Sequence, residues 1–352
     1  MKFVGKRMLI ISPEAWGTNK LSKHHYAEVL ASLGNEVTFA HPANPNSSGG
    51  AVQLIRDKVQ RGLTMLPGWG AKNLMKTEVN RLEKQHGPWD LIWSFDNSRL
   101  FYLDLFQAQK KIAHIMDFDM DYQTAHHASS ADLCFGVTTA IADRLRGYNS
   151  NSFLLEHGLR NLLAPKTPNE ILEGEKIALY IGNLLIKTLN RKLVLEVVKS
   201  SPETTFHFIG SVSTDNLNDS IDPKGANFIH QLQQLSNTHL HGTHSAESLS
   251  GFIQQADWCW LAYNTKEFPE QTANSHKILE YLAQGKNVFC TPMKAWIGNE
   301  MVTQYSSAEE LMKQVSKTDF NKVTTVEART KFAQTRTYEE RIREVENHLN
   351  VD

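Results

Sequence analysis

The sequence has few of the features that mark secreted, metal-binding or membrane-spanning chains. Its three cysteines, Cys134, Cys259 and Cys290, lie far apart, in neither disulfide nor metal-site spacing. Unpaired cysteines are typical of a reducing compartment, so we expect a cytoplasmic protein. No apolar run reaches the roughly 20 residues of a membrane-spanning helix, and the first run, Met8 to Ile11, is too short for a signal peptide.

An excess of charge of either sign is also missing. The 352 residues include 37 Lys and Arg against 38 Asp and Glu, a formal net charge of -1. A general nucleic-acid binder needs a basic face, so we expect no nucleic-acid partner. With 41% hydrophobic and 21% charged residues, the composition is that of a globular protein. The length suits two domains of about 100–200 residues each.

The first half alternates short apolar runs with amphipathic stretches. Met8 to Ile11 is followed by a loop, a stretch of helical periodicity from Ser22 to Leu33, and a second apolar run at Val37 to Ala40. This βαβ pattern indicates a parallel sheet. Further strands at 91–95, 111–116, 131–137 and 152–155, a helix at 139–146 and one or two helices within 51–85 complete a predicted α/β domain over residues 1–160.

A second series of the same kind follows a polar linker that contains Pro165 and Pro168. Strands are expected at 177–181, 205–209, 238–240, 258–262 and 287–290, and helices at 190–199, 245–255 and 274–284. We therefore predict two doubly wound domains, 1–160 and 161–330, that face each other across a cleft and bind ligands at the carboxyl ends of their strands. A long charged helix over 326–349 is expected to end the chain.

The segment from Asn274 to Val288 carries the clearest functional signal. Asn274 or Ser275 suits a helix N-cap, and a helix N-terminus attracts a pyrophosphate. Lys277 adds a cation there, and Glu280 can accept hydrogen bonds from the two hydroxyls of a ribose on the face it shares with His276. A capped amphipathic helix with a solvated lysine explains the same composition equally well.

This segment resembles the donor-site helix of GT-B glycosyltransferases, in the form found in bacterial polysaccharide-building members of the group 1 type. The resemblance rests on Ser275-His276-Lys277, on Glu280-Tyr281-Leu282-Ala283, and on Gly285-Lys286 to Val288. The resemblance implies two Rossmann-like domains, a nucleotide-diphosphate sugar as donor substrate, ribose binding by Glu280, and neither a bound metal nor another cofactor. Many retaining members carry a second glutamate eight positions earlier that contacts the sugar. Thr272 stands there in this chain, which slightly favours an inverting reaction.

The resemblance covers other strand-end loops of the second domain. The strand at 177–181 ends at Gly182, where the backbone can approach a ligand, and basic residues that suit a diphosphate follow it. An ordinary charged surface loop is the alternative for each segment. The predicted donor-binding residues are Gly182, Asn183, Lys187, Arg191, Lys192, Gly210, His244, Ser275, His276, Lys277 and Glu280.

The first domain is then expected to bind the acceptor and to supply a base. An inverting transferase needs a group that deprotonates the acceptor hydroxyl, and neighbouring carboxylates raise one another's pKa. In the acidic run 117–121 we favour Asp119 and then Asp117 as this base, with a helix-capping role as the alternative. The predicted acceptor-binding residues are Trp16, Gly17, His24 and His157.

The predicted function is a metal-independent transfer of sugar to a hydroxyl of a saccharide or lipid-linked acceptor, in cell-surface polysaccharide or glycoconjugate synthesis. A nucleotide-sugar 2-epimerase and a non-catalytic nucleotide-sugar-binding protein share the architecture, and both stay open. The stretch Thr337 to Arg341 resembles the final helix of the family, which implies that a tail over 331–352 packs back on the first domain. The basic stretch 69–84 fits either peripheral membrane contact or a core-facing helix.

Overall fold

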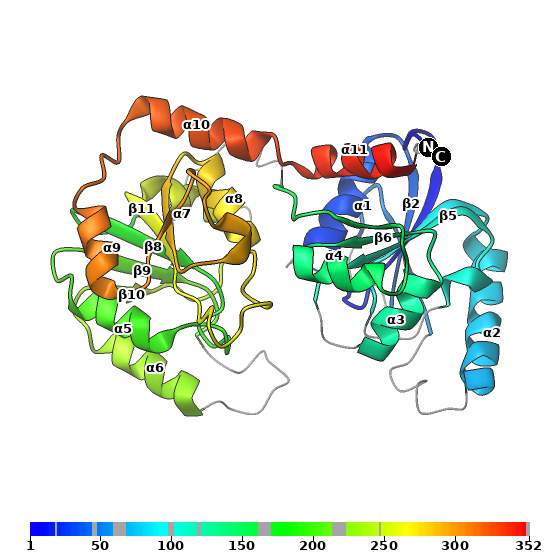
Figure 1. Ribbon diagram of the computed structural model, residues 1–352, viewed down its shortest axis with the longest axis horizontal. Coiled ribbons are helices and arrows are strands. Elements are labelled where there is room, and N and C mark those ends of the chain that lie inside the picture. Colours follow the sequence, from blue (N-terminus) through cyan, green and yellow to red (C-terminus); the bar gives the residue numbers. More distant parts are fainter. Residues whose placement is uncertain are drawn as a thin grey trace. The chain divides into compact units, whose positions relative to one another are not determined.

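A computed structural model describes residues 1–17, 20–43, 48–58, 68–97, 102–117, 121–160, 170–212, 223–245 and 248–349 (Figure 1). The chain divides into two compact units, Met1–Gly158 with Tyr338–Asp352, and Leu159–Thr337. Each unit is built on one parallel sheet that has helices on both faces (Figure 1). Among the described residues, none of the helices combines the length and the apolar character that crossing a bilayer requires.

The first unit contains a seven-stranded sheet in the order β3-β2-β1-β4-β5-β6-β7. Leu9 and Ile10 of β1 are both inaccessible to solvent and belong to different core clusters, one on each face of the sheet. The strands are β1 (Arg7–Ile11), β2 (Glu36–His41), β3 (Gln53–Arg56), β4 (Trp89–Ser94), β5 (Ala108–Ile115), β6 (Leu133–Gly136) and β7 (Ser152–Leu154). The helices are α1 (Ser22–Ser32), α2 (Gly68–His86), α3 (Asp121–Ser129), α4 (Thr139–Arg146) and α11 (Tyr338–Leu349).

The second unit contains a six-stranded parallel sheet in the order β10-β9-β8-β11-β12-β13. Its strands are β8 (Ile177–Ile181), β9 (Thr205–Ile209), β10 (Thr238–Leu240), β11 (Trp258–Leu261), β12 (Asn287–Cys290) and β13 (Thr303–Gln304). Its helices are α5 (Arg191–Lys199), α6 (Pro223–Gln233), α7 (Leu249–Gln255), α8 (His276–Ala283), α9 (Ala308–Val315) and α10 (Val323–Gln334). All adjacent strands pair in parallel.

The strand order reverses once in each sheet, between β1 and β4 and between β8 and β11. Loops leave in opposite directions at such a switch point, so a crevice forms outside the carboxyl ends of the two strands. The prediction of an α/β chain with two doubly wound domains is confirmed. Ligand-binding residues are therefore expected in the loops that follow β1, β4, β8 and β11.

The prediction of one helix over 326–349 is wrong. The chain forms α10 and α11 instead, with a break at Thr335–Thr337. At this break Leu159 bridges to Thr337 in parallel, and its N–H donates to the carbonyl of Arg336 over 2.7 Å. In a continuous helix the carbonyl of Arg336 would accept a hydrogen bond from within the helix. Here it accepts from Leu159, so the helix is interrupted. The chain passes from the first unit to the second between residues 158 and 159, and back to the first between 337 and 338. The sequence had suggested boundaries at 160/161 and 330/331.

The final helix α11 belongs to the core of the first unit. Tyr338, Ile342 and Val345 are buried there, and the ring of Tyr338 meets that of Tyr26 at 4.9 Å. Helix α2 likewise faces inward, since Met75, Val79 and Leu82 are buried in the same unit. Those apolar side chains therefore face the core. Of the two interpretations of the basic stretch 69–84, this is the core-facing helix.

Candidate functional sites

Two glycines at the carboxyl ends of β8 and β9 bring bare backbone together. The N–H of Gly182 donates to Ile209 (2.8 Å), and that of Gly210 donates to the carbonyl of Gly242 (2.7 Å). Gly182 has a φ of +158° and Gly210 a φ of +148°, a region that L side chains rarely adopt. A Cβ on Gly210 would lie 1.8 Å from the carbonyl oxygen of Gly182. The two peptides touch because Gly210 has no side chain.

Lys277, in the first turn of α8, lies beside this glycine pair. A Cβ on Gly182 would sit 3.1 Å from its Cε atom. The lysine is half-buried, and within the described part of the chain it has neither an ion-pair nor a hydrogen-bond partner. The first turn of α8 holds no acidic residue. A cation, a helix N-terminus and half-buried glycine backbone in one place form an arrangement that suits a diphosphate.

The N-terminus of α8 differs in one respect from the expectation. Ser275 is the N-cap residue, but its side chain makes no capping hydrogen bond. The side chain of Asn274 instead accepts from the N–H of Ser275 (2.8 Å) and from the indole N–H of Trp296 (3.0 Å). Asn274 therefore fixes the chain before the helix and leaves the capping position without a side-chain acceptor.

Helix α8 is fixed to the sheet and to α10 through its C-terminal half and the residues that follow it. The hydroxyl oxygen of Tyr281 accepts from the N–H of Ile181, the last residue of β8 (2.9 Å). The buried guanidinium of Arg329 donates to the carbonyl of Gly285 (2.8 Å) and to the side chain of Asn287. His276 is exposed and Glu280 is half-buried on the same helix. The lysine and glutamate are therefore carried on a rigid element.

The loop from Asn183 to Asn190 is held by the neighbouring strand. Asn190 donates its N–H to Ala262 (2.8 Å), and Asn264 donates to Thr188 (2.7 Å), just after β11. Within the loop the side chain of Asn183 accepts from the N–H of Leu185 (2.9 Å). The loop at the switch point is thus shaped by the end of β11.

The predicted basic residues of this loop take different places. Arg191 donates to the carbonyl of Leu185 (2.9 Å) and so supports the loop from within. Lys192 is exposed and lies 3.7 Å from Glu196, whereas Lys187 is exposed. The ring of His244 packs edge-on against Phe252 at 4.7 Å. Of the predicted donor residues, the structure brings Gly182, Gly210 and Lys277 into direct proximity.

Thr272, at the position of the missing glutamate, is buried. Its hydroxyl donates to the carbonyl of Phe268 (2.6 Å) within the loop before α8. The nearby acidic residues are also engaged, since Glu270 pairs with Lys294 and the side chain of Glu267 accepts from Asn264. The threonine is therefore part of the internal bonding of the loop.

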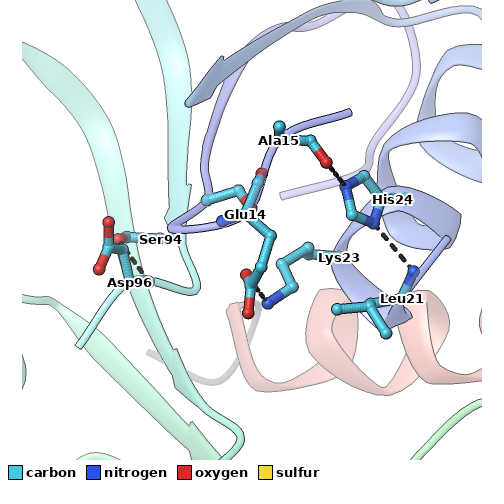
Figure 2. Close-up of polar contacts among 8 residues, drawn as sticks. Glu14, Ala15, Leu21, Lys23, His24, Ser94 and Asp96 are labelled. Carbon is cyan, nitrogen blue, oxygen red and sulfur yellow. Dashed lines mark hydrogen bonds and ion pairs between the residues drawn. The ribbon is translucent and has the colours of Figure 1, made fainter. Parts of the chain in front are cut away.

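In the first unit, the loop after β1 is held by two side chains from α1 (Figure 2). Buried Lys23 forms an ion pair with Glu14. The Nδ1 atom of His24 accepts from the N–H of Leu21 (2.9 Å), and its Nε2 donates to the carbonyl of Ala15 (3.2 Å). Burial, with Lys23 as a second cause, lowers the pKa of His24 to about 4. His24 is a neutral ring whose polar atoms both fasten backbone.

The other predicted acceptor residues surround this loop. Trp16 is only 6% exposed and packs edge-on against His24 (5.3 Å) and Phe39 (5.0 Å). Gly17 is exposed, and the Nδ1 atom of His157 lies 3.5 Å from the hydroxyl of Ser22. The tryptophan ring is therefore largely covered by the core, while Gly17 faces solvent.

The acidic run 117–121 is only partly described. Asp119 lies outside the described residues, and Asp117 is exposed, with its carbonyl accepting from the side chain of Asn97 (2.9 Å). Helix α3 begins at Asp121, so the acidic run ends at the start of a helix, as the helix-capping alternative requires. The role of Asp119 or Asp117 as the base stays a prediction.

Asp96 was not singled out from the sequence. It lies at the carboxyl end of β4, beside the switch point, and is fully buried. Its N–H lies 3.4 Å from the hydroxyl of Ser94 (Figure 2). The preceding N–H, of Phe95, donates to the carbonyl of Ile11 in β1. An acidic residue directly after a strand that reads as buried is the signal that could have found it. The described ranges contain no group of three or more side chains suited to a metal ion.

Several solved structures share the fold of this chain. It resembles a sucrose-phosphate synthase from Thermosynechococcus elongatus (TM-score 0.71, 14% identity, 97% of this chain and 98% of the other). It also resembles a glycosyltransferase from Rickettsia africae (TM-score 0.69, 13% identity, 99% of each chain). Anabaena HepE, solved with UDP-glucose, matches at a TM-score of 0.65 and 12% identity over 98% of this chain and 99% of its own.

These likenesses show the fold, which is the GT-B fold of two Rossmann-like domains that the resemblance implied. A Listeria monocytogenes protein described by its likeness to UDP-N-acetylglucosamine 2-epimerases shares the fold, at a TM-score of 0.56 and 12% identity over 97% of this chain and 95% of the other. No protein-family profile and no curated protein matches the sequence.

Proposed function

We propose that this protein is a glycosyltransferase that takes a sugar from a nucleotide-diphosphate sugar held at the carboxyl ends of β8 and β9. The observation that carries the proposal is the contact between Gly182 and Gly210 with Lys277 beside it. Diphosphates are bound elsewhere by the same combination of glycine backbone, helix N-terminus and a cation. As the resemblance to GT-B enzymes implies, we propose that the transfer needs no metal.

The chemistry asks the site to stabilise a leaving diphosphate. The acceptor oxygen attacks the anomeric carbon, the bond from that carbon to the β-phosphate oxygen breaks, and the acceptor proton passes to a base. Negative charge grows on the departing oxygen, where the dipole of α8 and the ammonium group of Lys277 act on it. Glu280 is proposed to bind the ribose, so that the donor lies along α8. Asp119 and Asp117 stay the candidate bases.

The acceptor is proposed to be a saccharide or a lipid-linked saccharide, as in the synthesis of cell-surface polysaccharide or glycoconjugates. A lipid-linked acceptor would bring this cytoplasmic protein to the inner face of the membrane. Thr272 supports an inverting reaction, since its hydroxyl donates to Phe268 and replaces the carboxylate that many retaining members use. HepE was solved with UDP-glucose, which makes UDP-sugars the first donors to test.

A thermal-shift screen with UDP-, GDP-, ADP- and dTDP-sugars tests the donor proposal. A ligand present at about 100 times its Kd stabilises the folded state by about 2.7 kcal/mol, and the melting temperature rises accordingly. The donor that gives a shift is then incubated with and without saccharide acceptors. Acceptor-dependent release of nucleotide supports the transferase.

The same incubation separates the alternatives. The likeness to the Listeria protein favours a 2-epimerase as second candidate, and epimerised nucleotide-sugar formed without any acceptor would establish it. Tight donor binding with neither transfer nor epimerisation over a broad acceptor set would leave a non-catalytic nucleotide-sugar-binding protein.

A further inference from the structure

Two histidines of the second unit form a hydrogen-bonded pair between two acceptors. The Nδ1 atom of His207, on β9, lies 2.9 Å from the Nε2 atom of His241, directly after β10. The other nitrogen of His241 lies 2.7 Å from a carboxylate oxygen of Glu170, and the Nε2 atom of His207 lies 2.9 Å from the carbonyl of Glu173. His207 is buried and the side chain of His241 is only 7% exposed.

Counting protons shows that this network carries one more than two neutral imidazoles supply. A carbonyl and a carboxylate both accept, so the outer nitrogens of His241 and His207 must each carry a hydrogen. The bond between the rings needs a third hydrogen. Three hydrogen bonds therefore need three protons, whereas two neutral rings hold two. Glu170 supplies the compensating negative charge.

The extra proton belongs on His241. Burial lowers the pKa of His207 to about 4, so that ring is neutral and accepts through Nδ1. His241 is then the imidazolium, which donates to His207 on one side and to Glu170 on the other. When this proton leaves, two nitrogen lone pairs face each other, and one of the three hydrogen bonds is lost.

The groups around His207 and His241 influence how readily the pair holds its extra proton. His239 stacks on His207 with ring centroids 4.8 Å apart, and His244 lies 6.5 Å from His241. Helix α7 contributes the uncharged ring of Phe252, 5.9 Å from His241. Glu170 is the acidic side chain bonded to the pair, and its neighbouring histidines oppose a second positive charge.

Glu170 is itself anchored, so the network fastens His241 to a fixed point. The side chain of Gln255, at the end of α7, donates to the carbonyl of Glu170 (3.1 Å) and accepts from the N–H of Leu172 (2.9 Å). Neither bond depends on a titrating group. Loss of the extra proton therefore weakens the side-chain attachment of His241, whose backbone N–H still donates to the carbonyl of Phe208 (3.0 Å), while the segment from Glu170 to Leu172 stays in place.

His241 directly precedes a residue of the candidate donor site. The carbonyl of Gly242 accepts from the N–H of Gly210 (2.7 Å), and Gly210 touches Gly182. The hydrogen bonds of His241 thus hold the loop that supports the glycine pair. We infer that the Glu170–His241–His207 network is a proton-dependent fastening of this loop and makes nucleotide-sugar affinity fall as pH rises. The affinity part rests on the function proposed above.

Nitrogen-detected NMR of the histidine rings tests the fastening without any nucleotide. Histidines exchange protons between about pH 5 and 8. We expect three ring N–H protons in the His207–His241 pair at the acid end and two at the alkaline end, with protection of the Gly210 amide against hydrogen exchange lost over the same transition. Glu170→Gln removes the compensating charge and should move the transition to lower pH. Two ring protons throughout, or Gly210 protection that ignores the transition, would overturn the inference.

UDP-glucose binding tests the consequence, because its diesterified phosphates do not titrate in this range. Loss of one hydrogen bond corresponds to a weakening of about two- to tenfold across the transition. His241→Gln should remove this pH dependence, and His230→Gln, an exposed histidine of α6, should keep it. The same pH dependence in His241→Gln as in the natural protein overturns the regulatory claim. Failure to bind UDP-glucose at any pH counts against the donor proposal, while the NMR result still decides the fastening.

Discussion

The carbonyl oxygen of Gly182 occupies the space that a side chain on Gly210 would need. A Cβ placed on Gly210 comes within 1.8 Å of that oxygen. The two residues end adjacent strands, β8 and β9, so this contact joins the tips of the two strands at the candidate donor site. The proposed donor site is built around this contact.

Gly210→Ala should therefore be costly both to stability and to nucleotide binding. Its φ of +148° alone costs an alanine about 1–3 kcal/mol of unfolding free energy, and the overlap with Gly182 pushes the two loops apart. Denaturant unfolding and calorimetry with UDP measure the two effects. Gly17→Ala is the matched control, because an added Cβ meets nothing within 4 Å there, and it should change stability by less than about 0.5 kcal/mol. A Gly210→Ala protein that binds UDP normally would contradict the account.

Arg329 should couple α10 to the position of α8. Arg329→Met leaves the carbonyl of Gly285 and the side chain of Asn287 without this donor in a buried place, which costs about 1–3 kcal/mol. We expect a lower unfolding midpoint and weaker UDP binding, because α8 carries Lys277. Lys331→Met on the same helix is exposed and serves as control. Equal midpoints for the two variants would show that the buried bonds contribute nothing.

Acid should destabilise the first unit through His114. Burial lowers its pKa to about 3, among the rings of Trp93, Phe95 and Tyr26. Between the unfolded value of about 6.5 and the folded one, the unfolded chain binds the extra proton. The free energy of unfolding therefore decreases as pH falls through this window, by up to about 1.4 kcal/mol per pH unit for this group.

His114→Phe keeps an aromatic ring in the stack and removes the titration. Denaturant melts from pH 7 towards acid should thus give a shallower decline for the variant than for the natural protein. His24, with a pKa lowered to about 4, adds a similar slope that His114→Phe leaves in place. Parallel declines in the two proteins would rule out His114 as a source of acid lability.

The base is predicted to be Asp119, with Asp117 as second choice. Removal of a general base typically slows the chemical step about 10²- to 10⁴-fold. Asp119→Asn should lower kcat by that order and leave UDP affinity unchanged, since the proposed donor site lies in the second unit. Asp117→Asn and Asp96→Asn are run beside it. The largest kcat loss in one of these two would transfer the assignment to that residue.

Much of the fold could be predicted because strands buried on both faces read directly as apolar runs. The strands at 177–181, 205–209 and 287–290 have the bounds that the sequence indicated. The edge strand β3 was missed, because Gln53 and Arg56 interrupt its apolar pattern. The break before α11 was missed as well. Its cause, the bridge from Leu159 to Thr337, joins residues far apart in the chain.

The candidate site was predictable where a residue type has one obvious use. Glycines after strands and a lysine at a helix start, together with the resemblance to GT-B enzymes, indicated Gly182, Gly210 and Lys277, which the structure places close together. Their role in donor binding stays a prediction. The burial of a candidate side chain could not be predicted from the local sequence in the same way. His24 and Trp16 suit ligand binding by type, and the structure shows that packing and backbone hydrogen bonds occupy them. The pairing of His207 with His241 depends on strand register, which sequence spacing does not give.

The most direct test of the account is UDP binding by Lys277→Ala measured against Lys331→Ala in calorimetry. Lys277 lies beside Gly182, whereas Lys331 is an exposed lysine of α10 in the same unit and outside the predicted donor site. A hydrogen bond to a charged group contributes about 1.5–3 kcal/mol. We expect Lys277→Ala to weaken UDP binding by roughly 10- to 150-fold and Lys331→Ala to change it far less. Unchanged affinity in Lys277→Ala would contradict a donor site at α8.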